Sequence, residues 1–238
     1  MQTQSYGSYV SASEIAKSNA RFLARVYGWM ASGVALTAIL AYFTATQDVF
    51  METLITNKPL FYGLLIAEFI CVLSFSAIAA RVSATVAGLL YFFYAGLTGI
   101  TLSVIFLAYT QSSIAQVFGV TAISFGGLSA FGALTKKDLG PVGSFCMMGL
   151  FGLIGYSLLS LFFPSLGGGT AGMVYSIAGV LIFAGLTAYD TQKIKSMNAP
   201  DLEGTEQGSK LAIHGALVLY LDFINLFLKL LRLFGRRK

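Results

Sequence analysis

Long apolar runs alternate with short polar segments along most of the chain. Each run has about the 17 to 25 residues that an α-helix needs to cross a bilayer, and the segments between them carry prolines, glycines and charges. Runs of this length and apolarity are typical of membrane spans, so the pattern predicts an all-α integral membrane protein with seven transmembrane helices. The predicted spans are residues 26–43, 60–80, 84–109, 114–134, 142–163, 171–189 and 211–234.

The last apolar run differs from the others because it carries a polar stripe. Asp222, Asn225, Lys229 and Arg232 follow one another at spacings of three, four and three residues. On an α-helix these spacings place all four side chains on one face. A carboxylate that faces hydrocarbon is costly, so this face should point into protein or a water-filled cavity. We therefore predict that residues 211–234 form a central helix surrounded by the others.

Composition and charge support a membrane protein with one domain. Of the 238 residues 56% are hydrophobic and only 11% are charged. We expect a polar N-terminal tail at residues 1–20 and a single transmembrane domain at 21–238, with the first span as the targeting signal. The net charge of +5 gathers at the span ends and the C-terminus, so the bilayer is the expected partner and nucleic acid is not.

The distribution of basic residues predicts a cytoplasmic N-terminus. Basic residues near the N-terminus, at Arg81, at 136–137 and at 193–195 all fall on one side when the spans alternate. Seven spans then place the basic residues 236–238 on the opposite side, against the same rule. The last helix either crosses in spite of this charge or enters the membrane and returns. Its apolar length favours crossing.

Four ionisable residues lie within or at the edge of predicted spans without an evident solvating partner. They are Glu68, Arg81, Asp190 and Asp222. Such residues indicate either a polar site or pathway between helices, or a structural ion pair that fixes helix packing. Two carboxylates in contact repel when both ionise, so an aspartate pair would titrate as a unit and could sense pH.

Whether the two aspartates meet depends on where their helices end. Asp222 lies eleven residues beyond Leu211, whereas Asp190 is at the predicted end of the sixth span. The carboxylates come level if the sixth helix continues to Lys195 and the seventh begins above the membrane interface, near His214. His214 lies on the face of Asp222 and is either a tuning residue for the pair or an ordinary interfacial histidine.

Three short stretches of the sequence resemble a known family. Residues 221–227 read LDFINLF, residues 230–232 read LLR and residues 189–192 read YDTQ. They are similar to motifs of the Bax inhibitor-1, or transmembrane Bax inhibitor motif, family in its bacterial branch. The resemblance implies two three-helix layers around a central seventh helix, a bacterial inner-membrane location and a pH-sensitive calcium leak governed by two aspartates.

Carried over to this chain, the resemblance assigns roles to several residues. Asp190 and Asp222 become the pH sensors and the weak, transient calcium ligands, with Glu68 and Asn225 as candidate polar lining. Calcium takes six to eight oxygen ligands, so carbonyls and water would complete its coordination. Arg81 stands where some family members carry an arginine that latches the closed pore. If it stabilises an ionised aspartate only in the closed state, flux rises on acidification. No resident cofactor is expected.

Three other classes of function remain open at this point. The first is a regulatory protein that modulates membrane-protein quality control. In such a protein the aspartates would act only in helix packing, and the tail at 1–20 would bind a membrane protease. An intramembrane aspartyl protease would also need two aspartates, but residues 219–221 read LYL where those enzymes carry a Gly-x-Gly motif. We therefore do not expect an enzyme. A proton-coupled transporter lacks the expected pair of broken helices.

Overall fold

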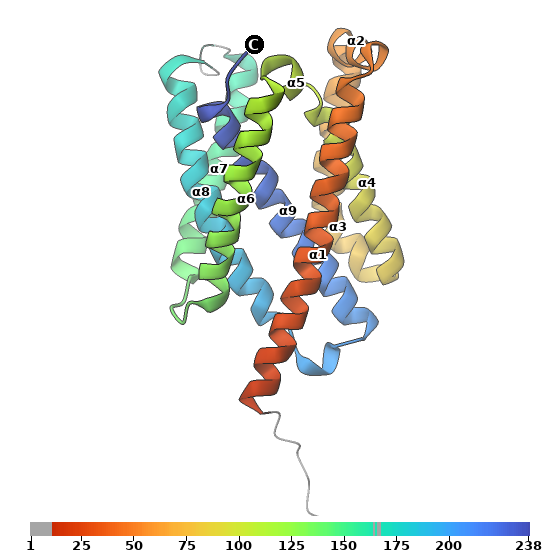
Figure 1. Ribbon diagram of the computed structural model, residues 1–238, viewed down its shortest axis with the longest axis vertical. Coiled ribbons are helices and arrows are strands. Elements are labelled where there is room, and N and C mark those ends of the chain that lie inside the picture. The colour runs from red at the N-terminus through yellow and green to blue at the C-terminus, as the bar shows by residue number, and fades with distance from the viewer. Residues whose placement is uncertain (1–10, 164, 166–167) are drawn as a thin grey trace, which may run out of the picture.

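Helices account for nearly all of the chain in the computed structural model, which describes residues 11–163, 165 and 168–238 (Figure 1). Seven helical segments of the described residues are long and apolar enough to cross a membrane, which confirms the predicted fold class. The elements are α1 (Ala12–Ala45), α2 (Asp48–Thr56), α3 (Lys58–Arg81), α4 (Ala84–Leu102), α5 (Ile105–Ala108), α6 (Gln111–Leu134), α7 (Gly140–Phe162), α8 (Gly169–Ser196), η2 (Pro200–Leu202) and α9 (Glu206–Phe234).

Helix α9 is the most buried spanning helix of the described residues. In its most apolar window 67% of the residues are buried, against at most 39% in any other span. It packs against α1, α3, α4, α6 and α8, and in Figure 1 it crosses the bundle behind α1 and α6. The predicted central position of the last helix is therefore confirmed. The division of the other six spans into two layers of three stays a prediction.

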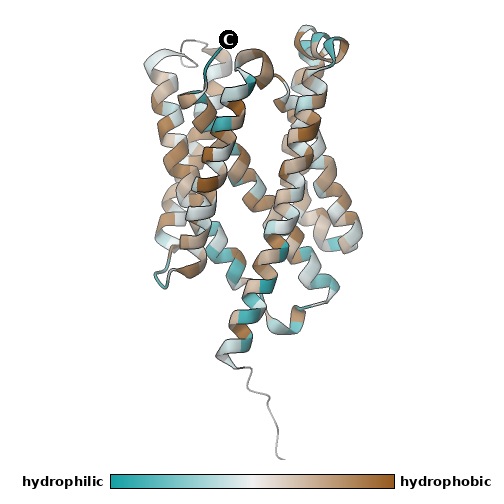
Figure 2. Cartoon of the chain, viewed as in Figure 1, coloured by the Kyte–Doolittle hydropathy of each residue, from teal (hydrophilic) through white to brown (hydrophobic). Residues whose placement is uncertain are grey.

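The outward-facing surface of the bundle is largely apolar (Figure 2). Phe69, Phe145 and Phe162 are among the large hydrophobic side chains that are exposed there. Hydrophilic residues concentrate at the start of α1 and in the loop between α8 and α9, at the lower end of the view. A soluble protein would not leave so much apolar surface in water, so this surface is the one that lipid covers.

Part of the predicted polar N-terminal tail is helical. Helix α1 begins at Ala12, because Ser11 and Glu14 form a capping box. The Ser11 hydroxyl accepts a hydrogen bond from the Glu14 N–H at 3.2 Å, and the Glu14 carboxylate accepts one from the Ser11 N–H at 2.9 Å. Residues 12–20 of the predicted polar tail are thus helical, while residues 1–10 lie outside the described residues.

The predicted third span, residues 84–109, is interrupted near its end. Helix α4 ends at Leu102, and the single turn α5 follows after Ser103 and Val104. The Ser103 hydroxyl donates to the carbonyl of Ile100 at 2.6 Å. A serine that bonds to a nearby carbonyl offers the backbone an alternative to the helical ladder, which accounts for the break at this residue.

The C-terminus lies at the opposite end of the bundle from the start of α1 (Figure 1). The Lys238 N–H donates to the carbonyl of Ala108 at 3.1 Å, and the Thr110 N–H donates to the carbonyl of Arg236 at 3.0 Å. These bonds fasten the tail to the connection between α5 and α6. Helix α9 therefore runs the length of the bundle and does not return, in agreement with the crossing that its apolar length favours.

The loop between α8 and α9 is tied to α1 by polar contacts. Arg21 donates to both carboxylate oxygens of Glu203, at 2.5 and 2.8 Å. The Asn198 amide donates to the Ser18 hydroxyl at 3.0 Å and to the Asn19 side-chain oxygen at 2.9 Å. Because α8 and α9 are joined by this loop, the contacts fix where both helices enter the bundle.

Acidification should loosen this loop. The hydrogen bonds from Arg21 lower the pKa of Glu203 below its ordinary value. A carboxyl with a lowered folded-state pKa stabilises the fold at neutral pH, and that contribution is lost as pH falls through the folded-state pKa. We expect faster amide hydrogen exchange in residues 197–205 at acid pH, and the same change at neutral pH in Glu203→Gln.

Glu52→Gln is the matched control, because Glu52 is an exposed glutamate on α2. Hydrogen exchange that is equally slow in Glu203→Gln and in wild type at neutral pH would show that the ion pair does not hold the loop.

Candidate functional site

Asp222 lies in the middle of α9 and faces the interior of the bundle. Its side chain is only 4% exposed. Its carboxyl group interacts with that of Asp190 on α8, which is half-buried. Helix α8 extends through Ser196 and α9 begins at Glu206, so both helices overrun the predicted ends of their spans. This extension brings the two carboxyl groups level.

One oxygen of this pair is left without a partner. Asp222 Oδ2 is buried and accepts no hydrogen bond from the described residues. A buried carboxylate oxygen without a donor is costly unless a proton, a water molecule or a cation satisfies it. The pair is therefore a site that favours a proton or another small positive species.

Contacts at and beside the pair connect α8 and α9 to α6 and α7. The Thr191 hydroxyl, one residue after Asp190, donates to the carbonyl of Thr187 at 2.8 Å, and its oxygen lies 3.3 Å from the hydroxyl oxygen of Ser129 on α6. The thiol of Cys146 on α7 lies close enough to interact electrostatically with both aspartates. The pair thus sits where α6, α7, α8 and α9 meet.

Lys193, which the sequence pattern assigns only to the orientation of the protein in the membrane, is a cation close to the pair. It lies three residues after Asp190 on α8 and interacts with that carboxyl electrostatically. Its ammonium also lies 5.7 Å from the centre of the Tyr189 ring. The spacing of three residues on one helix was the signal that could have identified it. Among the described residues, neither aspartate forms an ion pair.

Glu68 forms a separate polar contact between α3 and α4. Its carboxylate accepts a hydrogen bond from the Thr101 hydroxyl at 2.6 Å, and the side chain is half-buried. Cys71, Tyr94 and Tyr220 lie within its electrostatic reach. In the part of the chain that the structure describes, no hydrogen bond or ion pair joins Glu68 to the aspartates. Its role as pore lining stays a prediction.

The structure does not bring Arg81 or Asn225 to the aspartate pair. Arg81 is exposed at the end of α3, and no ion pair links it to either aspartate within the described ranges. The Asn225 amide donates to the carbonyl of Leu221 in its own helix, at 2.9 Å. The structure therefore supplies no latch contact, and the latching and lining roles of these residues remain predictions.

The two basic residues of the polar stripe on α9, Lys229 and Arg232, lie near an aromatic ring. The Lys229 ammonium lies 3.8 Å from the centre of the Tyr175 ring on α8, and the Arg232 guanidinium lies 5.7 Å from it. The Tyr175 hydroxyl forms a hydrogen bond with the Ser157 hydroxyl at 2.6 Å. These cations pack on an aromatic face, so they belong to a cluster separate from the aspartates.

His214 is half-buried on α9 and faces α3. Its Nδ1 lies 3.5 Å from the Ser76 hydroxyl, at the far end of hydrogen-bonding range. Both residues line a cavity of about 610 Å³, together with Glu206, Gln207 and Lys210. The structure therefore places His214 at this cavity and shows no direct contact between it and Asp222 in the described residues.

The pair alone does not make a tight metal site. No group of three or more His, Cys, Asp or Glu side chains suited to a metal ion occurs in the described residues. A calcium ion in transit at Asp190 and Asp222 would need carbonyl and water oxygens to complete its coordination. The weak and transient calcium binding expected at this pair stays a prediction.

Comparisons with known proteins support the resemblance over nearly the whole chain. The family model "Inhibitor of apoptosis-promoting Bax1" matches residues 19–238. "Inner membrane protein YbhL" of Escherichia coli (strain K12) is 44% identical, with 91% of this chain and 92% of that protein covered. An uncharacterized protein of Borreliella burgdorferi is 42% identical, with 92% and 93% covered. The chain therefore belongs to the Bax inhibitor-1 family of integral membrane proteins.

Proposed function

We propose that this protein is a pH-sensitive, calcium-permeable leak of the bacterial inner membrane, with Asp190 and Asp222 as its sensor and ion-binding pair. The observation that carries the proposal is the contact between these two carboxyl groups deep in the bundle, with one buried oxygen left unsatisfied. Ionisable groups inside membrane spans usually mark ion or proton pathways. YbhL of Escherichia coli, a relative, is named an inner membrane protein.

The number of protons on the pair should set how tightly α8 and α9 associate. When the carboxyls share a proton they attract, and when both ionise they repel unless a cation lies between them. Since the aspartates are on two different helices, this change acts directly on the packing of α8 against the central α9. A conformational equilibrium that binds protons differently in its two states must shift with pH.

Ion flux into liposomes that contain the purified protein tests the proposal. We expect calcium entry above that of protein-free liposomes, and entry that changes with pH. Equal flux in liposomes with and without protein, at every pH, would contradict the leak. In that case the regulatory alternative would stand, with the aspartates acting only in helix packing.

Arg81→Ala tests the proposed latch. If the closed state holds an ionised aspartate against Arg81, protons compete with the guanidinium, so acidification opens the pathway and flux rises. Arg81→Ala should then raise flux at neutral pH and flatten its pH dependence. If the pKa of the pair differs by one unit between the closed and open states, full protonation changes the ratio of open to closed protein about tenfold.

The matched control for this variant is Lys136→Ala, since Lys136 is an exposed basic residue in the loop after α6. A flux that falls on acidification in wild type would point instead to repulsion between the aspartates as the opening force. A wild-type pH response in Arg81→Ala would exclude Arg81 as the latch.

A further inference from the structure

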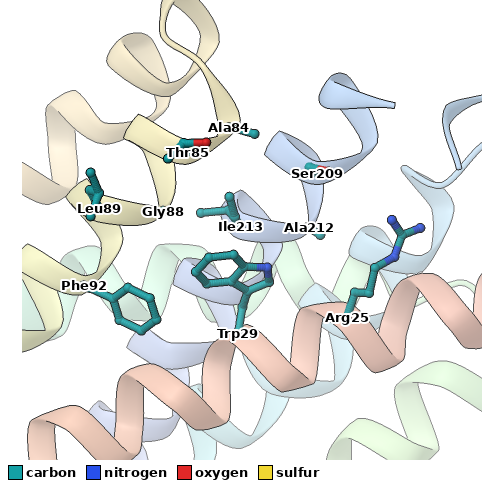
Figure 3. Close-up of a pocket in the computed structure, with 10 residues that line it drawn as sticks. All are labelled: Arg25, Trp29, Ala84, Thr85, Gly88, Leu89, Phe92, Ser209, Ala212 and Ile213. Carbon is teal, nitrogen blue, oxygen red and sulfur yellow. The ribbon is translucent and has the colours of Figure 1, made fainter. Parts of the chain in front are cut away.

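A second cavity lies between α1, α4 and α9, at the end of the bundle where α1 begins (Figure 3). Its volume is about 380 Å³, within the range of small-ligand sites and near its lower limit. Arg25 and Ser209 lie toward one end in the view, and Leu89 and Phe92 toward the other, with Trp29 between them. The cavity is thus polar at one end and apolar at the other.

Arg25 places a positive charge at the polar end of the cavity. The side chain is half-buried, and no ion pair involves it in the chain as described. Glu203 is near enough to interact with Arg25 electrostatically, but Arg21 donates to both of its oxygens. Glu206, the other nearby carboxylate, accepts from the Ala84 N–H at 3.2 Å and pairs with Lys210 at 3.9 Å.

Aromatic packing forms the apolar end. The Trp29 ring lies 5.4 Å from the Phe92 ring and 6.3 Å from the Tyr91 ring, centre to centre. A Cβ added at Gly88 would lie 2.9 Å from the edge of the indole, so this glycine lets Trp29 lie directly on the α4 backbone. The side chain of Leu89, at the rim, is 64% exposed and faces outward toward lipid.

The cavity lies at the level where two of the spanning helices begin. Helices α4 and α9 begin beside it, at Ala84 and Glu206, and the polar start of α1 extends beyond it (Figures 1 and 2). Tryptophan is enriched at this level of membrane proteins because its amphipathic ring suits the interface. A ligand in this cavity could place a charged group against Arg25. Its apolar part would then extend beyond Leu89 into the bilayer.

We propose that this cavity binds an anionic phospholipid. Its phosphate would pair with the Arg25 guanidinium, near the hydroxyl of Ser209, and the first part of one acyl chain would lie on Trp29 and Phe92. An arginine suits a phosphate because its planar fork of N–H donors can bond two phosphate oxygens at once. The volume holds a headgroup and the start of a chain, and the rest of the lipid stays in the membrane.

Trp29 allows a direct test, because it is the single tryptophan of the chain. Bromine on a lipid acyl chain quenches tryptophan fluorescence on contact. The full-length protein would be placed in vesicles of mixed phosphatidylglycerol and phosphatidylcholine, with the bromine carried first by one lipid and then by the other at equal total content. We expect stronger quenching when the bromine is on phosphatidylglycerol.

Substitution at Arg25 then tests the contact itself. Arg25→Gln should reduce the preference for phosphatidylglycerol about tenfold, as expected for the loss of a charge-assisted hydrogen bond. Arg25→Lys keeps the charge and should keep most of the preference, which controls for misfolding. Lys17→Gln removes an exposed charge from α1 outside the cavity and should leave the preference unchanged.

Equal quenching by the two brominated lipids in wild type would overturn the proposal, as would a preference that survives in Arg25→Gln. Glycerol phosphate added to the protein in detergent distinguishes a free phosphate from a lipid. If it changes Trp29 emission as strongly as phosphatidylglycerol does, the ligand is a soluble phosphate and the lipid assignment is wrong. None of these measurements depends on ion flux.

Discussion

Replacement of Asp222 by asparagine should abolish the pH response of ion flux and leave the fold intact. The amide keeps the shape of the carboxyl but cannot ionise, so the pair with Asp190 loses its coupled titration. A difference of one pKa unit between the open and closed states is worth about 1.36 kcal/mol, which is a tenfold change in the ratio of open to closed protein. The variant loses this contribution. Flux of Asp222→Asn in liposomes should therefore be nearly the same in neutral and acidic buffer.

Folding should tolerate this change because Asp222 Oδ2 has no hydrogen-bond partner in the described residues. Removing a buried charge without a compensating cation is often neutral or stabilising. We expect a melting temperature in detergent equal to or above that of wild type. This result would separate the sensor role from a structural ion pair, whose loss would destabilise the protein.

Glu203→Gln is the control for Asp222→Asn, because it removes a carboxyl that also titrates but lies in the loop outside the spans. It should loosen the loop and keep the pH response of flux. If Asp222→Asn retains a wild-type pH response, the aspartate pair is not the sensor. Asp190→Asn should match Asp222→Asn, and the double variant should add little, since contacting residues are not additive.

The positions of the spans could be predicted from the sequence because hydropathy reports directly on the membrane. The polar stripe of α9 also predicted its central position, since Asp222 could not face lipid. The exact ends of the helices could not be predicted. The start of α1 at Ala12 depends on the cap at Ser11, and the break after Leu102 depends on a hydrogen bond of Ser103 to its own turn.

The candidate site was predicted in part, for a related reason. The sequence predicts that Asp190 and Asp222 form a pair, but their contact depends on how far α8 and α9 extend, which hydropathy does not define. Asn225 shares a face with Asp222, as its spacing predicts, yet its amide bonds to the Leu221 carbonyl. A short polar side chain on a helix always has such local acceptors, so spacing alone cannot say whether it serves a site.

A tight backbone contact between α6 and α8 gives the last prediction. Gly132 on α6 lies against Ala188 on α8, and a Cβ at Gly132 would overlap the Ala188 carbonyl oxygen and lie 2.9 Å from its carbonyl carbon. Because both partners are backbone, neither can move aside alone. Gly132→Ala must separate the two helices, and overpacking of this kind costs about 1–3 kcal/mol, more than the ~1 kcal/mol gained in helix propensity.

Gly127→Ala is the matched control, since no heavy atom lies within 4 Å of a Cβ built at Gly127 on the same helix. Thermal unfolding in detergent should show a lower melting temperature for Gly132→Ala and an unchanged or higher one for Gly127→Ala. Because Ala188 is two residues before Asp190, the displaced α8 should also weaken the contact between the aspartates. A Gly132→Ala protein as stable as Gly127→Ala would show that the α6–α8 contact has room for a methyl group, contrary to the structure.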